Sequence, residues 1–170
     1  NDPDGNKYQE AYFDYYPNVW RHGDWTKLTG RGTLVIYGRS DATLNPGGVR
    51  IGTAEIYKVV ESFEEILESI VIGQEWEDDI RIVLFVKLKE KIFLDEKLKT
   101  EIKNKLRQLV SPRHVPAKII SVADIPRTRS GKITELAVRD VIHGKKIKNI
   151  EALSNPEALD LFKDLSELNN

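Results

Sequence analysis

The nearly continuous apolar run at residues 80–88 constrains the fold of this chain more than any other stretch. Within it, Ile82 to Val86 is the longest run made only of aliphatic and aromatic residues. A strand that is apolar on both sides has to be covered on both faces of its sheet. The run therefore predicts a central strand with other elements packed on either face, and it is far too short to span a bilayer.

The pattern around this strand predicts an α+β fold, a small sheet of about three strands plus a hairpin, flanked by helices. The expected elements, in chain order, are a helix over 53–69 that Thr53 caps, strands over 70–75 and 80–88, a helix that Asp95 caps with Leu98, Ile102, Leu106 and Leu109 on its apolar side, a strand over 117–122, and a helix over 135–142 ended by Gly144. A last helix begins with Asn155 as its cap and Pro156 at its first position, and its narrow apolar stripe of Leu159, Phe162 and Leu165 must dock against something.

Residues 1–40 do not look self-sufficient, because they hold more aromatic side chains than two strands can bury between themselves. Strands are expected over 19–26 and 33–37. We interpret them as strands detached from the sheet of a larger N-terminal domain, and the alternative is a hairpin packed on this domain. The chain also has no methionine, which we take as a sign of a fragment. The expected division is 1–40 as the end of the preceding domain, 41–143 as a C-terminal domain and 144–170 as a helical extension.

Composition narrows the possible partners. The chain is 40% hydrophobic and 31% charged with a net charge of −1, which is typical of a globular protein and argues against a nucleic-acid or membrane partner. With no cysteine there is no thiolate metal site, and a cytoplasmic location is expected. The three histidines, His22, His114 and His143, lack ligand spacing, so no metal site is predicted.

The stretch Pro126-Arg127-Thr128-Arg129-Ser130-Gly131-Lys132 places three cations beside two hydroxyl groups and a glycine, after one strand and before a helix. Such a tip suits a polyanion such as a nucleotide phosphate. The alternative is a solvated surface turn. A P-loop is excluded, because that motif needs glycine where Pro126 stands and serine or threonine where Ile133 stands.

A second unusual stretch covers residues 38–52, where four glycines accompany two arginines and one aspartate. Glycines at this density indicate unusual backbone angles or the close approach of a ligand. The alternative is a flexible hairpin in which Asp41 pairs with Arg50.

These two stretches together resemble a known family. The pattern G-R-x-D-x-x-x-N-x-x-G-x-R-I-x-x-x-E-I at residues 38–56, followed by P-x-T-x-S-G-K-I at 126–133, is similar to the C-terminal domain of the acyl-adenylate-forming enzymes. These include AMP-forming acyl-CoA synthetases, firefly luciferase and peptide-synthetase adenylation domains. A third family motif, ending in Gly-Asp, matches residues 20–25. The resemblance covers roughly residues 15–143.

Within this superfamily the chain looks most like the acetoacetyl-CoA synthetase subfamily. Tyr57 stands where acetyl-CoA synthetases usually have a glutamate. Residues 134–138 read Thr-Glu-Leu-Ala-Val in place of an arginine-rich run. The tail at 152–159 also resembles the C-terminal extension of that subfamily.

The resemblance implies a role for each residue at a matching position. Asp24 would accept hydrogen bonds from the ribose of AMP, Arg39 would donate to the ribose or phosphate, and Arg50 would face the phosphate. Asp41 would be the hinge between the large and small domains. Lys132 would be the catalytic lysine of adenylation, because a cation between carboxylate and α-phosphate stabilises the transition state.

The thioester-forming state would use other residues. Gly47 and Gly48 would line the tunnel that takes the pantetheine of CoA, and Arg107 would contact a CoA phosphate, unless it belongs to the solvated face of its helix. The implied function is the lid domain of an acetoacetate–CoA ligase, with ATP and CoA as substrates and Mg²⁺ bound with ATP mainly outside this chain. The alternative is a free-standing binding module that docks on a partner through its aromatic residues and its C-terminal stripe.

Overall fold

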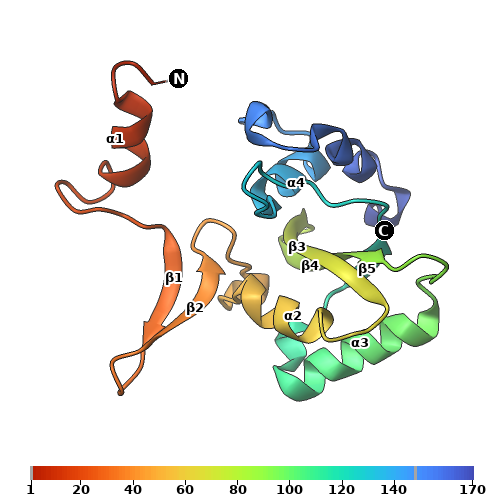
Figure 1. The fold of residues 1–170 in the computed structure, drawn as a ribbon. Coiled ribbons are helices and arrows are strands. Elements are labelled where there is room, and N and C mark those ends of the chain that lie inside the picture. The colour runs from red at the N-terminus through yellow and green to blue at the C-terminus, as the bar shows by residue number, and fades with distance from the viewer. Residues whose placement is uncertain (1, 148) are drawn as a thin grey trace.

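The structure, a computed structural model, describes residues 2–147 and 149–170. Asn1, in the expected 1–40 segment, and Lys148, in the expected 144–170 extension, lie outside the described residues. Within these ranges the strands form two separate sheets, one of two strands and one of three. Figure 1 shows the two-stranded sheet and the first helix standing beside a main body that holds the three-stranded sheet. The α+β class with a hairpin and a small sheet is confirmed.

The apolar run lies at the centre of the main sheet. Strand β4 (Asp79–Leu88) pairs antiparallel with β3 (Ile66–Trp76) and parallel with β5 (Lys118–Ser121). Successive side chains of β4 point to opposite faces, so Leu84 enters one apolar cluster and Phe85 the other. Both are fully buried. The continuous apolar run is therefore required because both faces of the sheet are covered.

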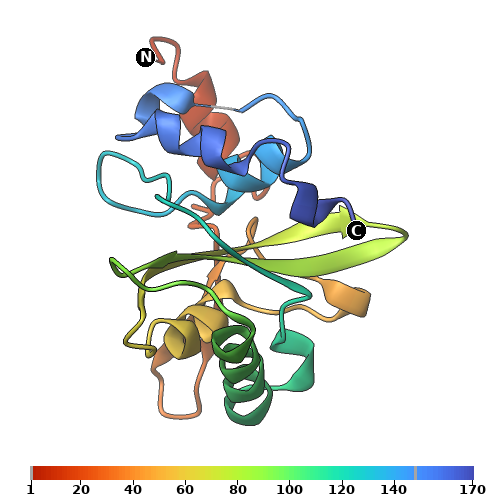
Figure 2. The same cartoon turned by 90° about the vertical axis from the view of Figure 1, so that its right-hand side faces the viewer.

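Helices α2 (Thr53–Val60) and α3 (Glu96–Leu109) cover one face of the sheet, seen below it in Figure 2. Asp95 caps α3 as expected, since its Oδ1 accepts a hydrogen bond of 2.8 Å from the main-chain N–H of Leu98. Leu109 was expected on the buried stripe of this helix but is 66% exposed. It is the last helical residue and lies beyond the edge of the cluster.

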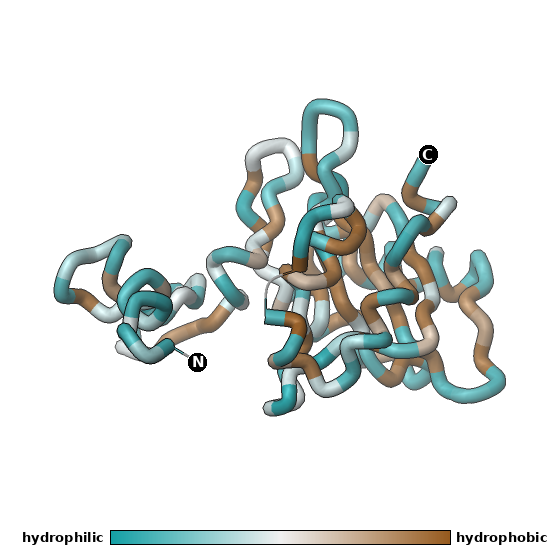
Figure 3. The backbone as a smooth tube through the Cα atoms, turned by 90° about the horizontal axis from the view of Figure 1, so that it is seen from above, coloured by the Kyte–Doolittle hydropathy of each residue, from teal (hydrophilic) through white to brown (hydrophobic). Residues whose placement is uncertain are grey.

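Helix α4 (Glu135–Ile142) and the 3₁₀ segment Pro156–Phe162 cover the other face. The ring of Phe162 lies edge-on to that of Phe85, with 4.9 Å between ring centroids. The C-terminal apolar stripe therefore docks on the sheet of its own chain. Pro156 begins a helical segment as predicted, although the segment is 3₁₀. Figure 3 shows the hydrophobic residues concentrated inside the main body.

The helix expected over 53–69 differs from the structure at its C-terminal end and in the residue at its N-terminal cap. Helix α2 stops at Val60, and the chain is a strand again from Ile66. Ile66 is buried while Leu67 is 51% exposed, which is the alternation of a strand and not the spacing of a helix. Thr53 is the first helical residue instead of the cap, and Gly52 occupies the cap position without a side-chain hydrogen bond.

The N-terminal part contains helix α1 (Asn6–Tyr12), which the sequence did not suggest, and the antiparallel strands β1 (Asp24–Leu28) and β2 (Leu34–Arg39). The aromatic residues pack largely on one another, with Tyr12 stacked on Trp20 at 4.2 Å. Along the described ranges, no helix is both long and apolar enough to cross a membrane.

Candidate functional site

The lysine loop, residues 126–132, is a closed turn. The N–H of Thr128 donates to the carbonyl of Lys132 at 2.8 Å, and the N–H of Gly131 donates to the carbonyl of Thr128 at 2.8 Å. Gly131 has φ +80°, a conformation that side chains disfavour. Arg127 braces the turn from inside, donating from Nη1 to the Gly131 carbonyl at 2.8 Å while its Nη2 pairs with Glu68 at 2.8 Å. Arg127 is therefore structural, and Lys132 is left exposed at the end of the turn.

Lys132 borders a cleft of about 400 Å³ that also reaches Arg39 and Asp41. The remaining lining comes from the N-terminal segment, at Ala11, Tyr12, Trp20, Arg21, His22 and Gly23. The cleft thus combines cations from three distant parts of the sequence with an aromatic wall. No ion pair of the Lys132 ammonium group is formed within the described residues. A free cation beside aromatic rings is a suitable setting for a nucleotide phosphate.

Arg39 connects Asp41 and Asp24 at one side of this cleft. Its Nε and Nη2 donate to the two carboxylate oxygens of Asp41 at 3.2 and 3.1 Å, and its Nη1 lies 3.7 Å from Oδ1 of Asp24. These hydrogen bonds to Asp41 raise the pKa of the Arg39 guanidinium. A Cβ on Gly23, where φ is +86°, would come within 2.8 Å of Arg39 Nη1. Arg39 therefore contacts Asp24 and Asp41 and shares the cleft with Lys132, whereas Asp41 was expected only as the hinge.

Gly47 and Gly48 form a separate turn at the other end of the β3–β4 hairpin. Their φ values are +56° and +73°. The N–H of Gly47 donates to both carboxylate oxygens of Asp79, at 3.0 and 2.8 Å. Glu68, which anchors the lysine loop, lies near the opposite end of the hairpin. A side chain on Gly48 would enter open space, so backbone conformation and not crowding within this chain requires the glycine.

The cations Arg50 and Arg107 do not join either group. The guanidinium of Arg50 lies over the ring of Trp25 at 5.9 Å, and the side chain of Arg107 donates to Asn104 on the solvent side of α3. The alternative pairing of Asp41 with Arg50 is not formed, because Asp41 pairs with Arg39. Near the glycine turn, the nearest cation is Arg113, whose Nη1 would lie 3.5 Å from a Cβ placed on Gly47. The sequence analysis did not single out Arg113.

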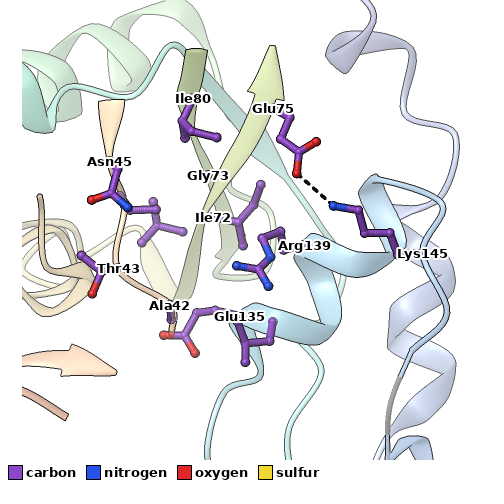
Figure 4. Close-up of a pocket in the computed structure, with 13 residues that line it drawn as sticks. Ala42, Thr43, Asn45, Ile72, Gly73, Glu75, Ile80, Glu135, Arg139 and Lys145 are labelled. Atoms are coloured by element: carbon purple, nitrogen blue, oxygen red, sulfur yellow. Dashed lines mark hydrogen bonds and ion pairs between the residues drawn. The ribbon is translucent and has the colours of Figure 1, made fainter. Parts of the chain in front are cut away.

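Residues next to Asp41 line a second cleft, of about 310 Å³, between the hinge segment, β3 and α4. Figure 4 shows Arg139 pointing into it, with the ion pair of Glu75 and Lys145 at its rim. That pair is 2.9 Å long. Arg139 donates to the main-chain carbonyl of Asp41 at 3.4 Å, so α4 contacts the expected hinge directly.

Tyr57 and Glu135 make a half-buried contact that sequence reasoning missed. The Tyr57 hydroxyl donates to Glu135 Oε1 at 3.1 Å. Burial raises the pKa of Glu135, and burial together with the neighbouring Glu135 carboxylate raises the pKa of Tyr57 well above its usual value. In the sequence, both positions differ from the pattern of acetyl-CoA synthetases, and this common difference was the only sign of the contact. Elsewhere, the described residues bring together no group of three histidine, cysteine or carboxylate side chains that suits a metal ion.

Comparison with known proteins identifies the family. Residues 55–132 match the family described as AMP-binding enzyme C-terminal domain. The chain is 67% identical over 168 residues to the acetoacetyl-coenzyme A synthetase of Rhizobium meliloti (strain 1021), which covers 99% of this chain and 26% of that protein. Residues 55–132 are thus identified as an AMP-binding enzyme C-terminal domain.

The chain is also similar to solved structures. Acetoacetyl-CoA synthetase from Streptomyces lividans is 44% identical with a TM-score of 0.88, over 100% of this chain and 26% of that one. The ATP-bound RpMatB-BxBclM chimera B1 is 27% identical with a TM-score of 0.67, over 82% of this chain and 27% of that one. The chain thus spans about a quarter of the length of the relatives it matches. The resemblance stated from the three motifs, including the acetoacetyl-CoA synthetase subfamily, is confirmed.

Proposed function

We propose that this chain is the lid domain of an AMP-forming acid–thiol ligase that converts acetoacetate, ATP and CoA to acetoacetyl-CoA, AMP and diphosphate. The observation that carries the proposal is the cleft that joins Lys132 to the Arg39–Asp41 pair. The acetoacetyl-CoA synthetases among its relatives support acetoacetate as the acid. The acid pocket itself would lie in the part of the relatives that this chain does not cover.

In the first half-reaction, a carboxylate oxygen attacks the α-phosphorus of ATP and the bond to diphosphate breaks. Negative charge grows on oxygens around the phosphorus, and the Lys132 ammonium group stabilises it without giving up its proton. Asp24 accepts hydrogen bonds from the ribose and Arg39 donates to the ribose or the phosphate. The closed turn and the Arg127 brace keep the lysine in place, which lowers the reorganisation needed during the reaction.

In the second half-reaction, the sulfur of CoA attacks the acyl carbonyl and AMP leaves. We assign the turn of Gly47 and Gly48 to this step. Support comes from its position at the opposite end of the β3–β4 hairpin from the lysine loop and from the open space above Gly48. A rotation about Asp41 then exchanges one end of the hairpin for the other. Arg107 stays the cation proposed for a CoA phosphate, and Arg50 the one proposed for the nucleotide phosphate.

The proposal also divides the chain and sets its surroundings. Residues 1–40 are the end of an N-terminal domain that carries most of the ATP, Mg²⁺ and acid contacts, residues 41–143 are the lid, and residues 144–170 are its extension. The cytoplasm, which supplies ATP and CoA, is the proposed location. The alternative is a free-standing module that docks on a partner through its aromatic residues and its C-terminal stripe. The stripe is not free to dock, because Leu159 and Phe162 are buried within this chain.

The test is ATP–diphosphate exchange dependent on acetoacetate. The full-length protein that carries this chain should catalyse it, whereas the 170-residue chain alone should not. Proximity within the complete site contributes about 7–11 kcal/mol to lowering such a barrier, and the isolated lid cannot supply it. Exchange by the isolated chain would contradict the proposed division of labour. Exchange with acetate but not with acetoacetate would contradict the proposed acid.

A further inference from the structure

The C-terminal extension reaches the lysine loop and bonds to it along its outer side. Residues 152–155, called the tail strand below, run beside residues 127–129. Thr128 and Leu153 form an antiparallel bridge. The N–H of Arg129 donates to the carbonyl of Ala152 at 3.1 Å, and the N–H of Ser154 donates to the carbonyl of Arg127 at 2.8 Å. Residues 127–129 therefore lie between the tail strand on one side and Lys132 and Ile133 on the other, and they pair with both.

Asn155 is the side chain that completes this arrangement. Its Oδ1 accepts the N–H of Arg127 at 2.8 Å, and its Nδ2 donates to Asp124 Oδ2 at 2.7 Å and to the carbonyl of Ile125 at 3.0 Å. One amide thus satisfies three groups on the chain that leads into the loop. The sequence suggested Asn155 as a helix cap, but the side chain makes no capping hydrogen bond and binds the loop instead.

The tail strand is itself anchored independently of the loop. Leu153 is buried against the second face of the sheet, together with Leu159 and Phe162. Because the core holds this segment in place, its main-chain hydrogen bonds restrict the motion of the loop. On its inner side the loop is closed by the Thr128–Lys132 hydrogen bond and by Arg127. The two sets of bonds together define the backbone that carries Lys132.

We propose that the tail strand is a working part of the lysine loop and that Asn155 is a positioning residue for adenylation. Asn155 does not touch the cleft, and it acts through the backbone of Arg127, Thr128 and Arg129. The catalytic consequence rests on the proposed function, because it requires Lys132 to act in adenylation. The structural consequence, an ordered loop backbone, does not.

The first experiment replaces Asn155 by alanine in the full-length protein and measures the two half-reactions. The substitution removes three hydrogen bonds, and adenylation should fall at least about 5- to 10-fold, the scale of losing one of them, with the KM for ATP little changed. Thioester formation from supplied acyl-adenylate should stay near the wild-type rate. The control is Asn169→Ala, in the same extension but exposed, which should leave both rates unchanged. Equal losses in both half-reactions would overturn the proposal.

A second readout does not depend on activity. In Asn155→Ala, the amide protons of Arg127 and Arg129 should exchange with solvent faster, while the amide of Phe85 in the central strand should not. If the amides of Arg127 and Arg129 keep their rates, the proposal is wrong whatever the activity. If they speed up while Lys132→Ala leaves adenylation intact, the proposed function fails and the structural link between tail and loop stands.

An exchange of side chains separates the specific contact from a general loss of stability. Asn155→Asp alone places a carboxylate 2.7 Å from that of Asp124, and it should impair adenylation more than alanine does. Adding Asp124→Asn restores a donor opposite an acceptor and should recover part of the loss, because the carbonyl of Ile125 still lacks its donor. Asp124→Asn alone is the control, because it also removes the ion pair with Lys87. A double variant no better than Asn155→Asp would overturn the proposal.

Discussion

The hydroxyl of Tyr57 donates to Glu135 Oε1 at 3.1 Å and accepts the main-chain N–H of Val71 at 3.1 Å. Tyr57 belongs to α2 and Glu135 is the first residue of α4, so the contact joins the two helical layers around the edge strand β3. Glu135 follows Lys132 by three residues. The contact therefore fixes the point at which the chain passes from the lysine loop into α4.

Replacing Tyr57 by phenylalanine should lower the free energy of unfolding by about 1–3 kcal/mol. The substitution leaves the N–H of Val71 and the carboxyl group of Glu135 without their partner at a half-buried place. Denaturant unfolding of both proteins measures the difference. Tyr37→Phe is the matched control, because no hydrogen bond of the Tyr37 hydroxyl is formed within the described residues, and it should change stability little.

The buried Glu135 should make stability depend on pH. Burial raises its native pKa above the ordinary 4.5. As the pH rises from 4.5 through the native pKa, the native state keeps a proton that the unfolded state has lost, so the stability of the wild type falls. Glu135→Gln keeps the acceptor for Tyr57 and has no such titration. Unfolding free energies measured from pH 4 to 8 should show the variant gaining on the wild type with rising pH. A constant difference would mean that Glu135 has no raised pKa.

Lys132→Ala should lower adenylation by at least about 10²–10³-fold in the full-length protein, the scale for removing one preorganised charge. Thioester formation from supplied acyl-adenylate should stay near the wild-type rate, because the lysine loop is then turned away. Single-turnover assays of each half-reaction measure this. Arg129→Ala, which removes an exposed cation on the same loop, should affect neither step. If both steps fall equally in Lys132→Ala, the lysine serves the fold or both states.

Gly48→Leu should show the reverse pattern. The leucine side chain enters the space proposed for pantetheine, so CoA-dependent turnover should collapse while adenylation survives. The φ of +73° adds strain of about 1–3 kcal/mol that has nothing to do with CoA. Gly144→Leu, with φ +63° and equally open space, carries similar strain at the end of α4 and is the control. Equal loss of both half-reactions in Gly48→Leu, with a melting temperature lowered as in Gly144→Leu, would mean that the backbone alone requires the glycine.

Phe162→Ala should destabilise the chain by about 3–5 kcal/mol, the usual effect of removing a buried aromatic ring. The ring is fully buried against Phe85. Thermal or denaturant unfolding measures the effect. Leu161→Ala, next to it but 37% exposed, should lower stability far less. A small effect of Phe162→Ala would show that the extension is dispensable to the core.

The sequence was sufficient for features that depend on local pattern. The central place of β4 followed from its unbroken apolar run, and the cap at Asp95 followed from residue type and spacing. The end of α2 was missed because Ile66 fits both the helical and the strand spacing, and only pairing with β4 decides between them. Asn155 was misread for a similar reason. Its residue type suits a cap, and its actual partners at Asp124 to Arg127 come near only in the folded chain.

For the candidate site, the family resemblance placed Asp24, Arg39, Arg50 and Lys132 at the nucleotide and Asp41 at the hinge, whereas the cleft holds Asp41 and not Arg50 beside Arg39 and Lys132. The sequence could not show that Arg127 supports the loop while Lys132 stays exposed. Both are cations of one loop, and only the fold brings Glu68 to Arg127. The pairing of Tyr57 with Glu135 joins positions 78 residues apart. A single sequence shows only that each of the two positions differs from the related pattern, and it does not show that they are in contact.

The covering of Phe85 by Leu159 and Phe162 has a consequence for synthesis. The sheet strands are complete once residue 121 has been made, yet their second face is covered only in part, by α4, until residues 159–162 leave the ribosome. Over that interval an apolar surface of the kind that chaperones bind is open, and folding of the lid has to wait for distant residues. A product that ends before residue 159 therefore leaves the Phe85 side of the sheet partly exposed, which favours aggregation.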